Sequence, residues 1–76
     1  MNLVETQVNT PFVATKEAIK LAGGPTATAK YFGVSRSAIH QWVERGCPAN
    51  RVLALSRLVE GRILPEEIRP DVFFLD

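Results

Sequence analysis

Apolar residues recur at helical spacing over residues 11–69, and glycine or proline interrupts them at short intervals. No stretch in this range alternates apolar and polar residues between turn signals, so strands are not predicted. The pattern instead predicts four helices and one further helical turn, at 11–22, 25–32, 36–45, about 49–60 and 64–68. The expected fold class is all-α, a small domain of four or five helices.

Capping residues and helix breakers set these boundaries. The first helix begins after Thr10 or, one turn later, after Thr15. The later boundaries rest on a proline at a helix start, a serine N-cap and glycines that follow a last helical residue: Pro25, Ser35, Gly23-Gly24, Gly33, Gly46 and Gly61. We expect Gly33 to adopt the left-handed conformation.

The two ends of the chain differ from this helical region. Residues 1–10 carry no helix signal and are expected to form a flexible, irregular arm or, alternatively, a short edge strand. Residues 11–76 are expected to form one domain, because a chain of 76 residues has room for one small core. Residues 72–75 are too apolar to remain exposed to solvent and should pack on the core or on a second subunit.

The predicted helix 36–45 divides into an apolar and a polar side. At about 100° per residue, the apolar residues Ala38, Ile39, Trp42 and Val43 fall together on one arc. The opposite arc holds Arg36, Ser37, His40, Gln41, Glu44 and Arg45. A solvated face usually carries Glu and Lys at i, i+4 spacing, whereas arginine and glutamine are the side chains that recognise guanine and adenine edges. We therefore expect this side to contact DNA bases and not only water.

The spacing of small and apolar residues fits a helix-turn-helix. That motif needs a small residue where its second helix crosses the first, and a glycine four positions later; Ala29 and Gly33 meet both needs. Four apolar residues are placed to hold the two helices together: Phe32, Val34, Ile39 and Trp42. Thr28 stands where an aliphatic residue is usual, and its hydroxyl needs a backbone carbonyl as acceptor. The second helix of such a motif enters the DNA major groove.

The segment from Ala22 to Phe73 resembles the Cro-type, lambda-repressor-like phage repressors and, more closely, the YdaS-like antitoxin group. The matching elements are Ala22-Gly23-Gly24, Phe32-Gly33-Val34-Ser35, the apolar arc of helix 36–45, Arg45-Gly46 and the ending Glu67-Ile68-Arg69-Pro70-Asp71-Val72-Phe73. The resemblance implies that Arg36, Ser37 and Gln41 contact bases. It implies that His40 contacts a base or a phosphate. Arg36 and His40 stand where many relatives carry Gln or Ser, so a mode of binding is implied and not an operator sequence.

The charges are distributed unevenly about a net charge of +1. Residues 15–57 hold seven basic and two acidic residues, whereas the remaining residues hold two basic and six acidic ones. A basic middle and an acidic C-terminal end predict one surface that faces a polyanion and one that is turned away from it. The residues predicted to contact DNA phosphates are Pro25, Thr26, Lys30, Ser35, Arg45 and Arg51. For Lys30, Arg45 and Arg51 the alternative is an ordinary solvated charge.

Several classes of protein are not expected. One cysteine, Cys47, and one histidine, His40, leave no ligand set for a metal and no intramolecular disulfide. Glu66 and Glu67 are adjacent on one helical turn and point apart, so we expect no acid/base pair, no enzymatic activity, no cofactor and no small-molecule substrate. No apolar run reaches the roughly 18 residues of a membrane span. Without a signal-peptide pattern at the N-terminus, a cytoplasmic protein is expected.

The C-terminal part carries more apolar surface than so small a core is expected to cover. Five of its residues are predicted to form a homodimer interface: Leu55, Val59, Ile68, Phe73 and Phe74. A two-fold axis in this part would set the two recognition helices about 34 Å apart, as a pseudo-palindromic operator requires.

The sequence thus predicts a sequence-specific transcriptional regulator, a Cro-type repressor that binds double-stranded DNA as a homodimer and excludes polymerase. An antitoxin that represses its own operon and pairs with a toxin protein is the alternative of the same class. A helical protein-interaction module, whose polar side is only solvated, is the alternative outside that class. RNA binding is less favoured, because no aromatic residue stands on the polar arc of helix 36–45 to stack on bases.

Overall fold

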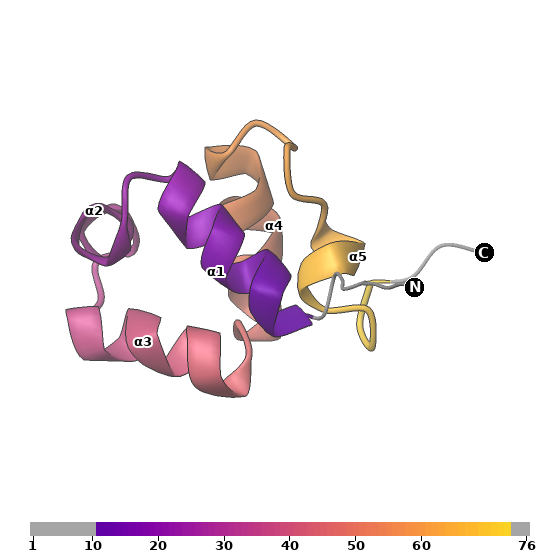
Figure 1. Cartoon of the computed structure of the whole chain (residues 1–76), viewed down its shortest axis with the longest axis horizontal. Helices are drawn as coiled ribbons and strands as arrows, with labels where there is room; N and C mark the ends of the chain where they lie inside the picture. Colours follow the sequence, from indigo (N-terminus) through magenta and orange to yellow (C-terminus); the bar gives the residue numbers. More distant parts are fainter. Residues whose placement is uncertain (1–10, 74–76) are drawn as a thin grey trace, which may run out of the picture.

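The computed structural model describes residues 11–73, and every regular element among them is an α-helix. In chain order the helices are α1 (Pro11–Leu21), α2 (Pro25–Phe32), α3 (Arg36–Arg45), α4 (Ala49–Leu58) and α5 (Pro65–Ile68), as Figure 1 shows. The predicted all-α class is therefore confirmed. The arm expected over residues 1–10 and Phe74 of the predicted dimer interface lie outside the described residues.

The described helix boundaries follow the predicted signals, with one exception, and the predicted cap Thr10 lies outside the described residues. Helix α1 begins at Pro11, and Thr15 is buried inside it and does not cap it. Helix α4 ends at Leu58, two residues before the predicted end. Glu60 and Gly61 both have positive φ, 58° and 74°, and the Gly61 N–H donates to the Ser56 carbonyl at 2.8 Å. The glycine therefore marks the second left-handed residue of a turn and not the position directly after the helix.

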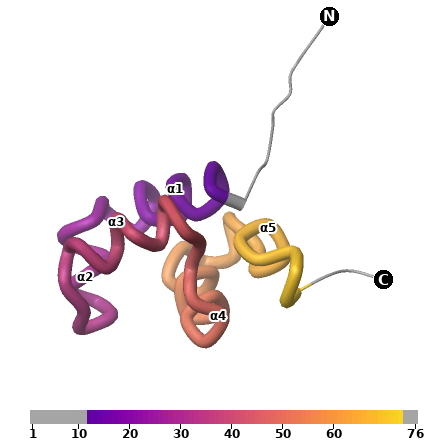
Figure 2. Tube along the Cα trace, turned by 90° about the horizontal axis from the view of Figure 1, so that it is seen from below, coloured from indigo at the N-terminus to yellow at the C-terminus, as the bar shows by residue number. Residues whose placement is uncertain are grey.

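Helix α1 is the central element of the fold. It contacts each of the other four helices, while α2 and α5 lie at opposite ends of the molecule (Figure 1) and keep this order in the view from below (Figure 2). Its buried side consists of Ala14, Thr15, Ala18 and Ile19. Three of these four side chains are small, and small side chains at a contact let helix axes approach more closely. This composition allows one short helix to serve as the partner of all the others.

The core draws on every helix. Its largest fully buried side chains are Ile39 of α3, Leu55 of α4 and Ile68 of α5. Burial of a side chain of this size contributes roughly 1.5–3 kcal/mol relative to exposure. Helix α5 is only four residues long, yet through Ile68 it closes the core against α1 and α4.

The predicted dimer interface is wrong for three of its residues. Leu55 and Ile68 are 0% exposed and Val59 is 4% exposed within a single chain, because α5 folds back onto α1 and α4. Phe73 packs against the same core and is partly buried. Among the described residues of α4 and the C-terminal segment, the large apolar side chains that are exposed are Leu53, Leu64 and Val72.

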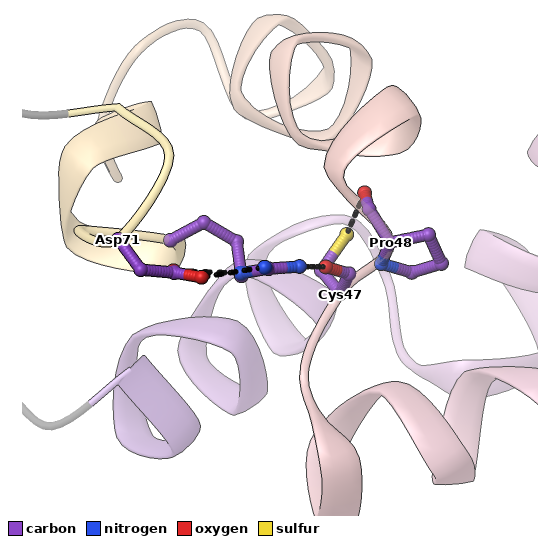
Figure 3. Close-up of polar contacts among 4 residues, drawn as sticks. Cys47, Pro48 and Asp71 are labelled. Atoms are coloured by element: carbon purple, nitrogen blue, oxygen red, sulfur yellow. Dashed lines mark hydrogen bonds and ion pairs between the residues drawn. The ribbon is translucent and has the colours of Figure 1, made fainter.

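An arginine ties the α3–α4 turn to the segment after α5 (Figure 3). Nη1 of Arg69 donates to the Cys47 carbonyl at 2.8 Å, and Nε and Nη2 donate to the two carboxylate oxygens of Asp71 at 2.8 and 2.7 Å. The hydrogen bonds from Arg69 hold the pKa of the Asp71 carboxyl below its usual value. A two-pronged pair of this kind fixes the plane of the guanidinium. Its third nitrogen is thereby aimed at the turn that follows α3.

Candidate nucleic-acid interface

The turn between α2 and α3 has the conformation that its glycine allows. Gly33 has φ 67° and ψ 34°, so the predicted left-handed residue is confirmed. Its N–H donates to the Lys30 carbonyl at 3.3 Å, and the Val34 N–H donates to the Ala29 carbonyl at 3.0 Å. This pair of bonds is a Schellman motif, which ends α2 and turns the chain. A Cβ at Gly33 would meet no atom within 4 Å, so the need for glycine is conformational.

Ser35 caps α3 as predicted. Its backbone is extended, and its Oγ accepts a hydrogen bond from the Ala38 N–H at 3.1 Å. An N-cap serine contributes roughly 1 kcal/mol to helix stability. The cap places Arg36 at the first position of α3 and so determines which side chains stand at the start of this helix.

The crossing of α2 and α3 is close and well filled. Ala29 is 6% exposed, and the Thr28 hydroxyl donates to the Gly24 carbonyl at 2.8 Å, which confirms the acceptor that the sequence required. The rings of Phe32 and Trp42 meet edge to face, with centroids 5.2 Å apart. Such pairs contribute about 0.5–1.5 kcal/mol beyond the area they bury. The two helices therefore form one rigid unit.

The polar face of α3 comprises six exposed side chains: Arg36, Ser37, His40, Gln41, Glu44 and Arg45. On the opposite side of the helix, Ile39 is 0% and Trp42 is 6% exposed. The only ion pair within residues 11–73 joins Arg69 to Asp71, so no charge on the polar face of α3 is paired inside this range. The donors and acceptors of this face are therefore available to another molecule.

The six residues predicted to contact phosphate lie close in sequence to the ends of α2, α3 and α4. Four of them are exposed, namely Thr26, Lys30, Ser35 and Arg45, and Pro25 is half-buried at the first position of α2. Arg51 is half-buried, and its guanidinium carbon lies over the Phe32 ring at 5.7 Å from the centroid. A cation held over an aromatic face is attracted by the ring. Of the six residues, Arg51 is therefore the least available for contact with a phosphate.

Two lysines to which the sequence pattern assigned no role also lie beside the polar face of α3. Lys16 and Lys20 of α1 surround, together with His40, an apolar hollow of about 290 Å³. The two lysines are one helical turn apart, and this i, i+4 spacing marks them as neighbours on one side of α1. Only the packing of α1 on α3 brings them to His40, and no local sequence pattern specifies that packing.

A sequence model of the family described as Bacterial toxin YdaS matches residues 15–74, a range that includes all of α2, α3, α4 and α5. The chain belongs to the YdaS family. The resemblance inferred from the glycine turn, the apolar arc of α3 and the C-terminal motif is thus confirmed. The description names a toxin, whereas the resemblance pointed to an antitoxin group.

One curated relative of this YdaS-family chain comes from Escherichia coli (strain K12) and is named Putative transcriptional regulator YdaS. The two proteins are 41% identical over 59 residues, which are 75% of this chain and 60% of the relative. The chain therefore spans about 60% of the length of the relative it matches. No solved structure matches it.

Cys47 of this YdaS-family domain is the second residue after α3 and is fully buried. Its Sγ donates weakly to the Pro48 carbonyl at 3.6 Å (Figure 3). Burial raises the pKa of the Cys47 thiol to about 12, and the charges of Arg69 and Arg51 offset this only in part. Within residues 11–73 no three His, Cys, Asp or Glu side chains gather as a metal site would require. No helix in that range is long and apolar enough to cross a membrane.

Proposed function

We propose that this YdaS-family chain is a sequence-specific DNA-binding transcriptional regulator that inserts α3 into the major groove of a pseudo-palindromic operator. The observation that carries the proposal is the polar face of α3, an exposed set of donors and acceptors on a helix whose other side is fixed in the core. Base recognition needs such rigidity, because side chains must meet base edges at hydrogen-bond distance. The name of the relative, a transcriptional regulator, supports the same function.

The roles proposed for the polar face follow from its chemistry. Arg36 suits the two acceptors of guanine, O6 and N7, and Gln41 suits the donor and acceptor pair of adenine. Ser37 and His40 lie between them in sequence and contact either a base or a phosphate. Arg36 and Ser37 start the helix, and the N-terminal residues of a recognition helix are those that contact base edges.

Contacts to the DNA backbone would orient α3 in the groove. We assign these contacts to Thr26, Lys30, Ser35 and Arg45. Pro25 and Arg51 are half-buried, and Arg51 also lies over the Phe32 ring, so both are assigned a smaller part. Each phosphate neutralised by a lysine or arginine releases counterions, so duplex affinity should fall steeply as salt increases.

A homodimer remains part of the proposal, with a revised surface. The buried residues of α4 and α5 cannot supply it, whereas Leu53, Leu64 and Val72 are 48%, 44% and 41% exposed. The C-terminal segment is rich in acidic residues, so contacts between two copies there keep this charge away from phosphates. Two bound copies would occupy the operator and exclude polymerase from it.

Footprinting on the DNA that flanks the gene of this protein tests the proposal. The protected duplex and a scrambled duplex are then compared by fluorescence anisotropy over a series of salt concentrations. The double variant Arg36→Ala, Gln41→Ala should bind both duplexes with the same affinity. Arg57→Ala, which removes an exposed charge from α4 outside the proposed interface, should keep the preference of the wild type. Duplex binding that is absent or insensitive to salt would favour the protein-interaction module instead.

The family description, Bacterial toxin YdaS, favours a second function as part of a toxin–antitoxin pair. In that role the chain is either the toxin itself or the antitoxin that represses its own operon. Induced expression distinguishes the two, because a toxin arrests growth and an antitoxin restores growth against the product of a neighbouring gene. The double variant in α3 shows whether either effect depends on DNA.

A further inference from the structure

The hollow beside α3 is a second place where unpaired basic groups gather. It is lined chiefly by Lys16, Ile19 and Lys20 of α1, Pro25 of α2, and His40 and Val43 of α3. We propose that this hollow binds a small molecule in which a carboxylate is joined to a compact apolar body, and that this ligand lowers the affinity for DNA. The first part of this proposal, ligand binding, depends only on the hollow. The second part, the regulatory half in which the ligand lowers DNA affinity, rests on the proposed function.

The interior of the hollow favours an apolar group. Its lining surface is almost wholly apolar, and three of the residues that line it are the apolar Ile19, Pro25 and Val43. A volume of about 290 Å³ lies just below the range of roughly 300–1,000 Å³ for small-molecule sites. One ring or two fused rings would fill it. The release of water from such a surface to bulk lowers the free energy and so favours the binding of an apolar group.

The rim of the hollow favours an anion. Lys16 and Lys20 are exposed and take part in no ion pair within residues 11–73. None of the lining residues is an aspartate or a glutamate, and the neighbours in sequence, Glu17 and Glu44, do not line the hollow. A lysine lays its methylene stem along apolar surface and keeps its ammonium group at the water boundary. Two such ammonium groups above an apolar floor match a ligand with one charged and one apolar end.

His40 links the hollow to DNA binding. Its side chain lines the hollow and also belongs to the polar face of α3. A carboxylate that accepts a hydrogen bond from the imidazole would hold the ring against α1 and remove it from the DNA contact. Coupling of this kind is reciprocal, so bound DNA should lower ligand affinity by the factor by which the ligand lowers DNA affinity.

Amide-detected NMR on the DNA-free protein tests binding, with 1-naphthoate as the probe and 1-naphthalenemethanol as its neutral counterpart. We expect 1-naphthoate to shift the amides of Ile19, Val43 and Gly24, which also lines the hollow, saturably at low millimolar concentration. The alcohol should bind at least about tenfold more weakly. Lys16→Gln with Lys20→Gln should abolish this preference, and both residues are exposed, so the fold should persist. Lys30→Gln, an exposed lysine of α2 that does not line the hollow, should retain it.

Equal binding of the two probes, shifts outside the hollow or a failure to saturate would overturn the ligand site. The ligand site would also be overturned if the wild type did not bind 1-naphthoate and the double lysine variant lost affinity for duplex. That result would mean that the hollow receives a DNA phosphate. Binding of 1-naphthoate without any loss of duplex affinity would overturn the regulatory half. A protein that binds 1-naphthoate but no duplex at all would refute the proposed function and leave the site intact.

Discussion

Four side chains within the first six residues of α3 carry the proposed specificity, and they differ in what they can distinguish. Arg36 has only donors, in a planar fork, whereas the Gln41 amide offers both donors and an acceptor. The Ser37 hydroxyl rotates to suit either partner, and the His40 ring has two distinct nitrogens. Recognition of a particular base pair therefore rests chiefly on Arg36 and Gln41, whose geometry is the most restrictive.

Single substitutions test this assignment. Arg36→Ala and Gln41→Ala should each relax specificity at one base pair and cost roughly 1–3 kcal/mol of operator affinity. Binding to a set of single-base operator variants measures the effect, with Arg57→Ala as the control. Unchanged affinity of both variants for operator and for random duplex would mean that another surface contacts the bases.

The thiol of Cys47 gives a prediction about pH. The unfolded chain loses the thiol proton above its ordinary pKa of 9.0, whereas the folded chain keeps it until about pH 12. The free energy of unfolding should therefore fall between pH 9.0 and about 12, with a slope of up to about 1.4 kcal/mol per pH unit from this group. Denaturant unfolding of the wild type and of Cys47→Ala isolates that slope, since other titrating groups act in both. If the free energies of unfolding of the two proteins changed with pH by the same amount, the prediction would be contradicted.

At the scale of elements, α2 and α3 act as one unit because Ala29 lets them approach. A leucine at Ala29 should force the two helices apart and lower stability by roughly 1–3 kcal/mol or more. Ala27→Leu makes the same change at an exposed position of α2 and should alter stability little. Thermal unfolding and duplex binding provide the measurements. An Ala29→Leu protein with the melting temperature and DNA affinity of the wild type would contradict the close crossing.

The element scale also separates what the sequence could predict from what it could not. The boundaries of α2 and α3 depend on Gly33 and Ser35, whose effects act within a few residues, and both were predictable. The end of α4 depends on the left-handed conformation of Glu60, a residue type that gives no signal for it. The burial of Leu55 and Ile68 depends on where α5 folds back, and this is a tertiary contact that no local pattern records.

At the scale of the whole molecule, Leu64 and Val72 are the exposed apolar residues that flank α5, and they belong to the surface proposed for self-association. Leu64→Glu with Val72→Glu should weaken the dimer by at least about tenfold, because two charges would be buried against a second copy. Leu21→Glu changes an exposed leucine, the last residue of α1. It should leave the dimer unchanged. Analytical ultracentrifugation with the three proteins measures the effect. A wild type that is monomeric at tens of micromolar would rule out this surface.

The contact between α1 and α5 joins the first and last helices of the described chain. During synthesis, α3 leaves the ribosome well before Ile68 and Arg69, which complete the core and hold the turn after α3. Contacts between distant parts of a chain form only once both parts are present. A nascent or truncated chain that ends before residue 65 therefore leaves part of the buried side of α1 uncovered, and α3 lacks a complete scaffold. Competence for the proposed DNA binding should therefore arrive only after α5 and Arg69 have been translated and have folded back onto α1 and the turn after α3.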